Sequence, residues 1–279
     1  MILIIESGST KADWVLLDST GIKLSFKTKG WNIMLLDELE MSCRLNRLAD
    51  LNPFKDYIKE VYFYTSGASI LSSVLSLNQL LKTKFINANV FVESDLLAAA
   101  RSLYNGKPLF VSILGTGSNT AFYDGEELVQ STPSLGYILG DEGSGARLGK
   151  SLLKAYLYKT LPATLFLTFS KENSISKENV LKAVYTQQSP NKFLASYVPF
   201  LVANKNHEFV NSLVKDEFKS YFKIHLNSNV AILDFPICFI GSIAFLFQDT
   251  LKELCKEYSI KESRYIQSPL NGLVEYHSK

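Results

Sequence analysis

The chain has 279 residues, of which 47% are hydrophobic and 20% are charged. These values are typical of a globular protein with a large core, folded as one large domain or as two of average size. The formal net charge is only +2 and the basic residues are scattered along the sequence. Nucleic acid is therefore not an expected partner.

Cysteine usage and hydrophobicity indicate a cytoplasmic protein without a membrane partner. Cys43, Cys238 and Cys255 form no CxxC pair, which favours reduced thiols over a disulfide framework or a metal site. Residues 1–10, MILIIESGST, are apolar only over a short run and have no basic flank, so we expect a strand there rather than a signal peptide. No apolar run approaches the ~20 residues that span a bilayer.

The chain begins with expected strands on either side of a glycine-containing loop. Ile2–Ile5 is fully apolar, as in a central strand, and Ala12–Asp18 and Ile22–Thr28 follow it. The loop, residues 6–11, has the sequence ESGSTK. Such a loop presents backbone N–H groups and hydroxyls, which bind phosphate. Because it joins two antiparallel strands and has neither GxxxxGK[ST] nor GxGxxG, it differs from the P-loop and the Rossmann loop.

Helices and strands alternate over the next eighty residues. A candidate functional residue, Asp95, follows the last of these strands and begins a helix. Capping alone would account for it, because Ser94 or Asp95 is expected to be the N-cap of that helix. The expected elements are Leu36–Leu51 (helix), Glu60–Thr65 (strand), Ile70–Leu81 (helix), Asn89–Glu93 (strand) and Leu96–Leu103 (helix).

A second glycine-rich region begins after the expected strand Leu109–Leu114. The loop 115–119, GTGSN, leads into an expected hairpin that turns at Asp124-Gly125. Another loop, residues 140–145 (GDEGSG), then runs directly into a helix. Packing does not explain two such loops about twenty residues apart, whereas phosphate binding does.

The order of the elements predicts an architectural repeat. Three strands, then helices alternating with strands, are followed by three strands and helices again, which predicts domains at 1–106 and 107–268. A helical insertion is expected at about 146–226, and the final helix is expected to pack back on the first domain within 269–279. The later expected elements are the helices Ala146–Leu161, Ala163–Phe169, Lys177–Tyr185, Phe193–Ala203, His207–Leu226, Ile243–Tyr258 and Pro269–His277, and the strands Ile237–Ile240 and Arg264–Ile266.

The motifs together resemble those of the sugar kinase, Hsp70 and actin superfamily, and within it the N-acetylglucosamine kinases and BadF/BadG-type ATPases. The resemblance runs from residue 4 to about 245. It implies an α/β fold of two ribonuclease H-like (actin-like ATPase) domains, each a mixed five-stranded sheet flanked by helices, with a cleft between them for ATP, Mg²⁺ and a sugar. It also implies a homodimer. The matching segments are Ser7–Trp14, Glu93–Asp95, Gly115–Asn119, Gly140–Ser144 and Gly241-Ser242.

The resemblance also implies a role for individual residues. Asp95 resembles the general base that takes the proton from the sugar hydroxyl, a suitable task for a carboxylate in phosphoryl transfer. Glu6 corresponds to the carboxylate that holds Mg²⁺. Sugar-contacting positions are Asn32, Asp95, Ser118, Asn119, Ser134, Gly136 and Asp141. Positions that contact ATP are Ser7, Gly8, Ser9, Thr10, Lys11, Gly115, Thr116, Gly117, Gly241 and Ser242.

Two departures from the family pattern leave alternatives open. The family usually has Asp where this chain has Glu6, and the animal N-acetylglucosamine kinases have an aromatic residue in place of Leu135. We expect an ATP-dependent kinase that phosphorylates the 6-hydroxyl of a hexosamine, N-acetylglucosamine. The alternatives are a catalytically degenerate, sugar-binding regulator and an ATPase that activates a partner protein.

The histidines are expected to be surface or core residues. None of them has an acidic or cysteine partner at the spacing of metal ligands. They are His207, His225 and His277.

Overall fold

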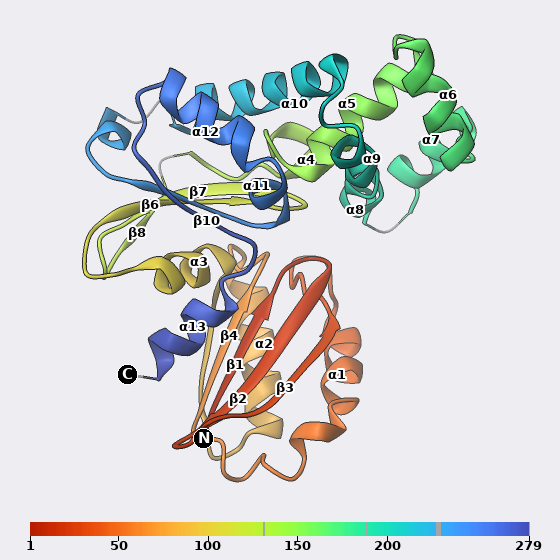
Figure 1. Ribbon diagram of the computed structural model, residues 1–279. Coiled ribbons are helices and arrows are strands. Elements are labelled where there is room, and N and C mark those ends of the chain that lie inside the picture. Colours follow the sequence, from red (N-terminus) through yellow and green to blue (C-terminus); the bar gives the residue numbers. More distant parts are fainter. Residues whose placement is uncertain (131, 188, 227–229, 279) are drawn as a thin grey trace. The chain divides into compact units, whose positions relative to one another are not determined.

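The computed structural model describes residues 1–130, 132–187, 189–226 and 230–278 (Figure 1). The chain folds into two compact units, one of Met1–Asn105 with Pro269–Lys279 and the other of Gly106–Ser268. Each unit contains a mixed five-stranded sheet flanked by helices. The predicted α/β fold class is confirmed.

The first unit is organised around β1, which lies in the middle of the sheet. The strand order is β3-β2-β1-β4-β5, with β1 antiparallel to β2 and parallel to β4, and β4 parallel to β5. The carboxyl ends of β1, β4 and β5 therefore meet at one edge. The strands are β1 (Ile2–Ser7), β2 (Lys11–Asp18), β3 (Gly21–Lys29), β4 (Glu60–Thr65) and β5 (Asn89–Ser94).

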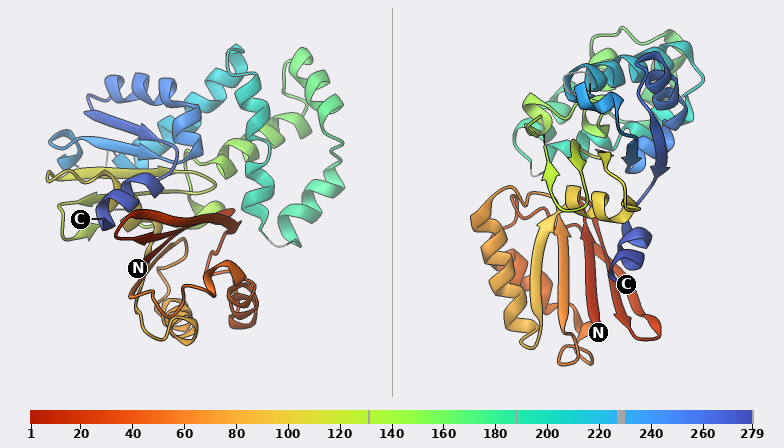
Figure 2. Two further views of the ribbon diagram at one scale, coloured as in Figure 1. Left: turned by 60° about the horizontal axis from the view of Figure 1, so that its bottom comes forward. Right: turned by 90° about the vertical axis from the view of Figure 1, so that its left-hand side faces the viewer.

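Alternating side chains of this sheet build two cores, one on each face. One core combines Leu3, Ile5 and Trp14 with residues of α1 and α2. The other combines Ile4 and neighbouring strand residues with α3 and α13, which lie together on the sheet although far apart in the sequence (Figure 2). The helices are α1 (Glu38–Asn46), η1 (a 3₁₀ turn, Ala49–Leu51), α2 (Leu71–Lys84), α3 (Asp95–Leu103) and α13 (Leu270–His277).

The sheet of the second unit has the order β10-β9-β6-β7-β8. β6 is antiparallel to β7 and parallel to β9, as β1 is to β2 and β4 in the first unit. The strands are β6 (Leu109–Leu114), β7 (Ser118–Tyr123), β8 (Leu128–Val129), β9 (Ile237–Ile240) and β10 (Glu262–Ile266).

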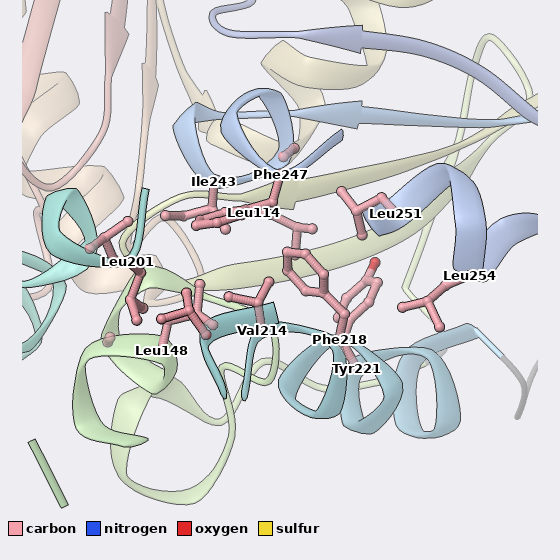
Figure 3. Packing of buried hydrophobic residues seen from close by; sticks show 14 of the residues in the cluster. Leu114, Leu148, Leu201, Val214, Phe218, Tyr221, Ile243, Phe247, Leu251 and Leu254 are labelled. Carbon is pink, nitrogen blue, oxygen red and sulfur yellow. The ribbon is translucent and has the colours of Figure 1, made fainter. Parts of the chain in front are cut away.

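Helices cover this second sheet and form the large insertion between β8 and β9. Leu148, Val214, Phe218 and Tyr221 pack with residues of β6 and α11 in one continuous core (Figure 3). No described helix is both long enough and apolar enough to cross a membrane. The helices are α4 (Gly136–Leu139), α5 (Gly145–Leu157), α6 (Ala163–Glu172), α7 (Lys177–Tyr185), α8 (Pro190–Ala195), α9 (Val198–Ala203), α10 (Glu208–Tyr221), η2 (a π-helical turn, Phe222–Leu226), η3 (a 3₁₀ turn, Val230–Leu233), α11 (Ser242–Leu246) and α12 (Gln248–Glu257).

Several predicted helices are shorter or divided in the structure. The expected helix 193–203 is interrupted between α8 and α9, where Pro199 lies in the first turn of α9 and has no N–H for a continuous helix. The expected helices 36–51 and 243–258 are also divided, into α1 and η1 and into α11 and α12. The second strand of the predicted hairpin is reduced to β8, because Asp124 accepts hydrogen bonds from the amides of Glu126 and Glu127 at 2.8 and 2.7 Å.

The packing of α13 on α3 depends on a residue without a side chain. A Cβ atom at Gly272 would lie 2.2 Å from the carbonyl oxygen of Ser102 in α3. The two helices therefore approach so closely at this point that only glycine, which has no side chain, fits at position 272.

Replacing Gly272 by Ala is expected to destabilise the first unit. Alanine favours a helix over glycine by about 1 kcal/mol, but the clash with Ser102 forces the helices apart, at an expected net loss of about 1–3 kcal/mol. Urea denaturation measures the free energy of unfolding, and Asn271→Ala, at an exposed position of α13, is the matched control. A Gly272→Ala protein as stable as the control would show that α13 does not need this close crossing.

Candidate functional site

The first glycine loop, residues 8–10, connects β1 with β2 and is supported from behind by Gly30. The amide of Gly30 donates to the carbonyl oxygen of Thr10 at 3.0 Å. A Cβ atom at Gly30 would lie 2.2 Å from the carbonyl oxygen of Gly8. Within the described residues, the N–H groups of the loop itself make no hydrogen bond. They are therefore available to an anion.

Asn32 is hydrogen-bonded to this loop. Its Nδ2 donates to Ser9 Oγ at 3.2 Å, and Ser9 Oγ lies 3.4 Å from Ser66 Oγ, just beyond the end of β4. Its Oδ1 accepts from the amide of Met34 at 3.2 Å, and a Cβ atom at Gly67 would lie 2.5 Å from that oxygen. The structure thus brings a predicted sugar contact, Asn32, together with a predicted phosphate contact, Ser9.

The side chain of Ser7 points into the protein. It is fully buried, and its Oγ accepts from the amide of Trp31 at 2.7 Å. The Thr65 hydroxyl donates to the carbonyl oxygen of Trp31. These bonds fix the segment before Asn32 to the ends of β1 and β4. The Ser7 hydroxyl has a structural partner, so a phosphate contact at this position would use its backbone.

Glu6 lies in an unfavourable environment for a negative charge. It faces Asp13 across the β1–β2 pair, and Asp13 forms ion pairs with Lys11 at 3.0 Å and with Lys27 at 3.4 Å. Burial, with further contributions from Asp13 and Asp95, raises the pKa of Glu6 to about 7, although Lys11 partly offsets this. A cation beside Glu6 would relieve the repulsion.

Asp95 is the first residue of α3 but does not cap it. The N-cap is Ser94, whose hydroxyl accepts from the amide of Leu97 at 3.1 Å. Burial raises the pKa of Asp95 to about 6, although the backbone N–H groups of Leu96 and of Asp95 itself partly offset it. Capping therefore does not account for this carboxylate, and its raised pKa is suited to a general base near neutral pH.

The described residues include no group of three or more His, Cys, Asp and Glu side chains that could hold a metal ion. Mg²⁺ needs fewer protein ligands, because one or two carboxylates bind it together with water and substrate phosphates. Glu6, with its raised pKa and hard oxygen donors, fits such an ion.

The second glycine loop, residues 115–117, is supported by the start of α5. The amides of Gly145 and Ala146 donate to the carbonyl oxygens of Gly115 and Thr116 at 2.8 and 3.1 Å. In the part of the chain that the structure describes, the amides of Thr116 and Gly117 make no hydrogen bond. The amide of Gly115 donates to the carbonyl oxygen of Gly117 at 2.9 Å, so the two N–H groups of the loop that are available to an anion are those of Thr116 and Gly117.

Asp141 packs against this loop. Its Oδ1 accepts from the amide of Ser118 at 3.3 Å, and a Cβ atom at Gly117 would lie 3.0 Å from its Oδ2. Burial raises the pKa of Asp141, although the Ser118 amide partly offsets this. The Ser118 hydroxyl is buried and has no partner among the described residues. Two predicted sugar contacts are thus adjacent, and one has an unused hydroxyl.

The other predicted sugar contacts of this unit have no hydrogen bond to Asp141 among the described residues. Asn119 accepts hydrogen bonds from the amide of Thr120 at 2.9 Å and from the side chain of Gln130. Ser134 is exposed, and Gly136, at φ +70°, begins the short helix α4. No hydrogen bond between described residues joins either of them to Asp141.

Gly241 forms a close contact with the base of the second loop. Its amide donates to the carbonyl oxygen of Ile266 at 3.0 Å, its φ is +113°, and a Cβ atom would lie 2.3 Å from the carbonyl oxygen of Leu114. Any side chain here would displace the end of β6. Ser242 is the first residue of α11. The predicted adenosine-side residues are therefore next to the predicted phosphate loop.

The histidines have partners that the sequence analysis did not anticipate. His225 is a buried residue, and its Nε2 lies 3.1 Å from Oε2 of Glu142, whose side chain is also buried. His277 Nε2 lies 2.8 Å from the hydroxyl of Tyr64, and burial lowers the pKa of His277 to about 4. His207 caps α10. No local pattern in the sequence could have predicted the pairing of His225 with Glu142, because the two residues are 83 positions apart.

Stability is expected to depend on pH through Glu6. Between the ordinary pKa of 4.5 and about 7, the folded chain binds more protons than the unfolded chain, so the unfolding free energy decreases as pH rises. Glu6→Gln should remove this loss and be more stable than the wild type above pH 7, by on the order of 2–3 kcal/mol. Below pH 4.5 the difference should disappear.

Urea denaturation from pH 4 to 8 measures this dependence. Asp95 also has a raised pKa, so it contributes a similar decrease in unfolding free energy with rising pH in the wild type and in Glu6→Gln. Glu275→Gln, at an exposed position of the same unit, is the control. Parallel stability curves for wild type and Glu6→Gln would contradict the raised pKa of Glu6.

Comparison with known proteins adds independent information. No protein-family model and no curated protein matches the sequence. A crystal structure from Porphyromonas gingivalis, of a protein proposed to be an N-acetylglucosamine kinase, is 34% identical, with a TM-score of 0.94 over 100% of this chain and 99% of that one.

More distant structures share the fold. One from Chromobacterium violaceum, also proposed to be an N-acetylglucosamine kinase, is 14% identical with a TM-score of 0.63, over 99% of this chain and 98% of that one. The ROK family glucokinase of Streptomyces griseus, in complex with glucose and AMPPNP, is 15% identical with a TM-score of 0.57, over 98% and 97%. At these identities the likeness concerns the fold alone.

Proposed function

Because the chain belongs to the N-acetylglucosamine kinase and BadF/BadG-type ATPase family of the sugar kinase–Hsp70–actin superfamily, we propose that it is an ATP-dependent sugar kinase. The reaction proposed is transfer of the γ-phosphoryl group to the 6-hydroxyl of a hexosamine, N-acetylglucosamine. The observation that carries the proposal is the pair of glycine loops, in which the amides of residues 8–10 and those of Thr116 and Gly117 have no partner among the described residues.

Each loop would bind phosphate oxygens through its backbone. An N–H group that is already oriented and unpartnered binds an anion without rearrangement, which favours charge stabilisation in phosphoryl transfer. Gly30 and the start of α5 support the loops from behind.

Asp95 would act as the general base. Its carboxylate would accept the proton of the sugar hydroxyl as that oxygen attacks the γ-phosphorus, and its pKa of about 6 leaves it mostly ionised at pH 7. Glu6 would hold Mg²⁺, which when bound neutralises charge on the phosphates. A Glu in place of the usual Asp adds one methylene, which an intervening water can absorb.

The sugar would be recognised by short polar side chains that donate and accept hydrogen bonds. Ser118 has an unused buried hydroxyl beside Asp141, and Asn32 is hydrogen-bonded to the first loop. Leu135 is 55% exposed and lacks the aromatic ring of the animal enzymes. The cytoplasmic location and the homodimer stay predictions.

Two other functions are consistent with the same fold. Glu6 is the feature that favours a degenerate sugar-binding regulator, which would bind sugar without ATP turnover. An ATPase that activates a partner would hydrolyse ATP with no sugar present.

An ADP-release assay across a panel of sugars tests all three functions. With Mg²⁺, we expect turnover to depend on an added sugar and to be fastest with N-acetylglucosamine, compared with glucosamine, glucose and N-acetylmuramic acid. Sugar binding without turnover would instead identify a regulator, and turnover that is independent of every sugar would identify an ATPase.

Replacing Asp95 by Asn tests the general base. The change removes the proton acceptor but keeps the shape of the side chain, so kcat should fall by about 10²- to 10⁴-fold, while the dissociation constant of the sugar stays within a few-fold of the wild type. Asp56→Asn, at an exposed position of the first unit, is the control. Normal kcat in Asp95→Asn would refute the assignment.

Replacing Glu6 by Gln or by Asp tests the metal role. Gln removes the charge, so the Mg²⁺ concentration for half-maximal rate should rise at least about tenfold, whereas Asp restores the residue usual in the family and should keep the rate within a few-fold. The measurement is an Mg²⁺ titration of sugar-dependent ADP release. Equal titration curves for all three proteins would exclude a metal role for Glu6.

A further inference from the structure

A buried hydroxyl at the end of α10 connects the strands that carry the second glycine loop. The hydroxyl of Tyr221 lies 2.5 Å from Ser112 Oγ in β6 and 2.5 Å from Thr120 Oγ1 in β7. These two residues face each other in the β6–β7 pair, which leads into and out of the loop. The ring of Tyr221 lies beside Phe218 in the core (Figure 3). A phenylalanine would fill the same space, so the hydroxyl serves a polar purpose.

One turn further on, a second buried contact joins the same helix to the loop 140–145. His225 Nε2 and Glu142 Oε2 are 3.1 Å apart, and the two side chains are 6% and 7% exposed. Glu142 directly follows Asp141, whose carboxylate accepts from the amide of Ser118. His225, just beyond the end of α10, is thus linked through Glu142 and its neighbour Asp141 to Ser118, the residue that follows the loop 115–117.

The two contacts belong to one structural element. The rings of Tyr221 and His225 stack with centroids 5.1 Å apart at an interplanar angle of 24°. His225 lies on the π-helical turn Phe222–Leu226, and such turns are frequent at functional sites. Gly143, at φ +71°, packs so closely that a Cβ atom would lie 3.0 Å from Tyr221 Cβ. The end of α10 and the π-helical turn that follows it thus contact the loop 140–145 and the two strands that flank the loop 115–117.

The polar character of this turn is unfavourable for packing alone. A buried acid–histidine pair gives up the hydration of both groups, and apolar side chains of similar volume are often at least as stable. Buried, fully oriented polar groups do, however, fix the geometry of the segments that they join. Two such groups four residues apart, one bonded to the strands that flank the loop 115–117 and the other to the loop 140–145, favour a role in positioning.

We propose that Tyr221 and His225 are positioning residues for the sugar kinase reaction, which rests on the function proposed above. Tyr221 fixes the second glycine loop through Ser112 and Thr120, for ATP. His225 fixes Asp141 through Glu142, for the sugar. Neither residue takes part in the chemistry.

Two replacements of His225 separate positioning from volume. The amide nitrogen of Gln lies where imidazole Nε2 lies, so His225→Gln can still donate to Glu142. The amide nitrogen of Asn lies at the position of Nδ1, so His225→Asn loses the contact. Tyr221→Phe removes only the two hydrogen bonds of the hydroxyl. His207→Asn, at the start of the same helix, keeps an N-cap residue and is the control.

Amide hydrogen exchange tests the positioning directly. In His225→Asn, the amides of Ser118, Gly145 and Ala146 should exchange at least about tenfold faster than in the wild type, whereas in His225→Gln and in the control they should stay within about threefold. Equal exchange in His225→Gln and His225→Asn overturns the proposal for His225. If His225→Asn does not fold, Glu142→Gln is compared with Glu142→Ala in the same way.

Kinetics test the consequence for the reaction. His225→Asn should raise the KM for sugar about tenfold, with the KM for ATP within twofold, and Gln should restore the sugar KM. Tyr221→Phe should raise mainly the KM for ATP. If a variant instead raises the KM for sugar and the KM for ATP by similar factors, in proportion to the decrease in its melting temperature, its residue has a merely structural role. A wild type without sugar-dependent turnover would refute the proposed function, while hydrogen exchange would still decide whether the turn positions the loops.

Discussion

The candidate site depends on one property of the backbone: the amides of residues 8–10 and those of Thr116 and Gly117 have no partner in the described chain, while the carbonyl oxygens or the rear surface of each loop make internal contacts. Gly30 supports the first loop, and the amides at the start of α5 bond to the second. Such loops need residues without side chains at close approaches, which explains why Gly30 and Gly241 are glycines. A bound anion would complete the hydrogen bonding that the fold leaves open.

The first unit also places carboxylates near its glycine loop. Glu6 and Asp13 lie on the adjacent strands β1 and β2, Asp95 follows β5, and burial together with repulsion from both carboxylates raises the pKa of Glu6 to about 7. An isolated folded chain would be more stable without this charge, so the arrangement is costly for folding and useful for a cation and a proton acceptor. The buried pair of Glu142 and His225 in the second unit is likewise costly for folding. There we propose that the gain is the fixed position of the loop 140–145 rather than the binding of a charge.

Local patterns were sufficient to predict the strands and loops that carry the site. The apolar run Ile2–Ile5, the glycine loops and the order of strands predicted two mixed sheets, because these features act over a few residues. Helix ends were predicted less well. Pro199 divides one expected helix and Asp124 shortens one expected strand through its side-chain hydrogen bonds, and both effects depend on details that periodicity does not express.

The sequence by itself determined the fold class and the positions of the candidate loops and carboxylates. Only the tertiary structure decided that the Ser7 hydroxyl is used internally and that His225 pairs with Glu142. The physical reason is separation along the chain. A hydrogen bond between residues far apart leaves no periodic trace in the sequence, because it depends on how sheets and helices pack rather than on neighbouring residues.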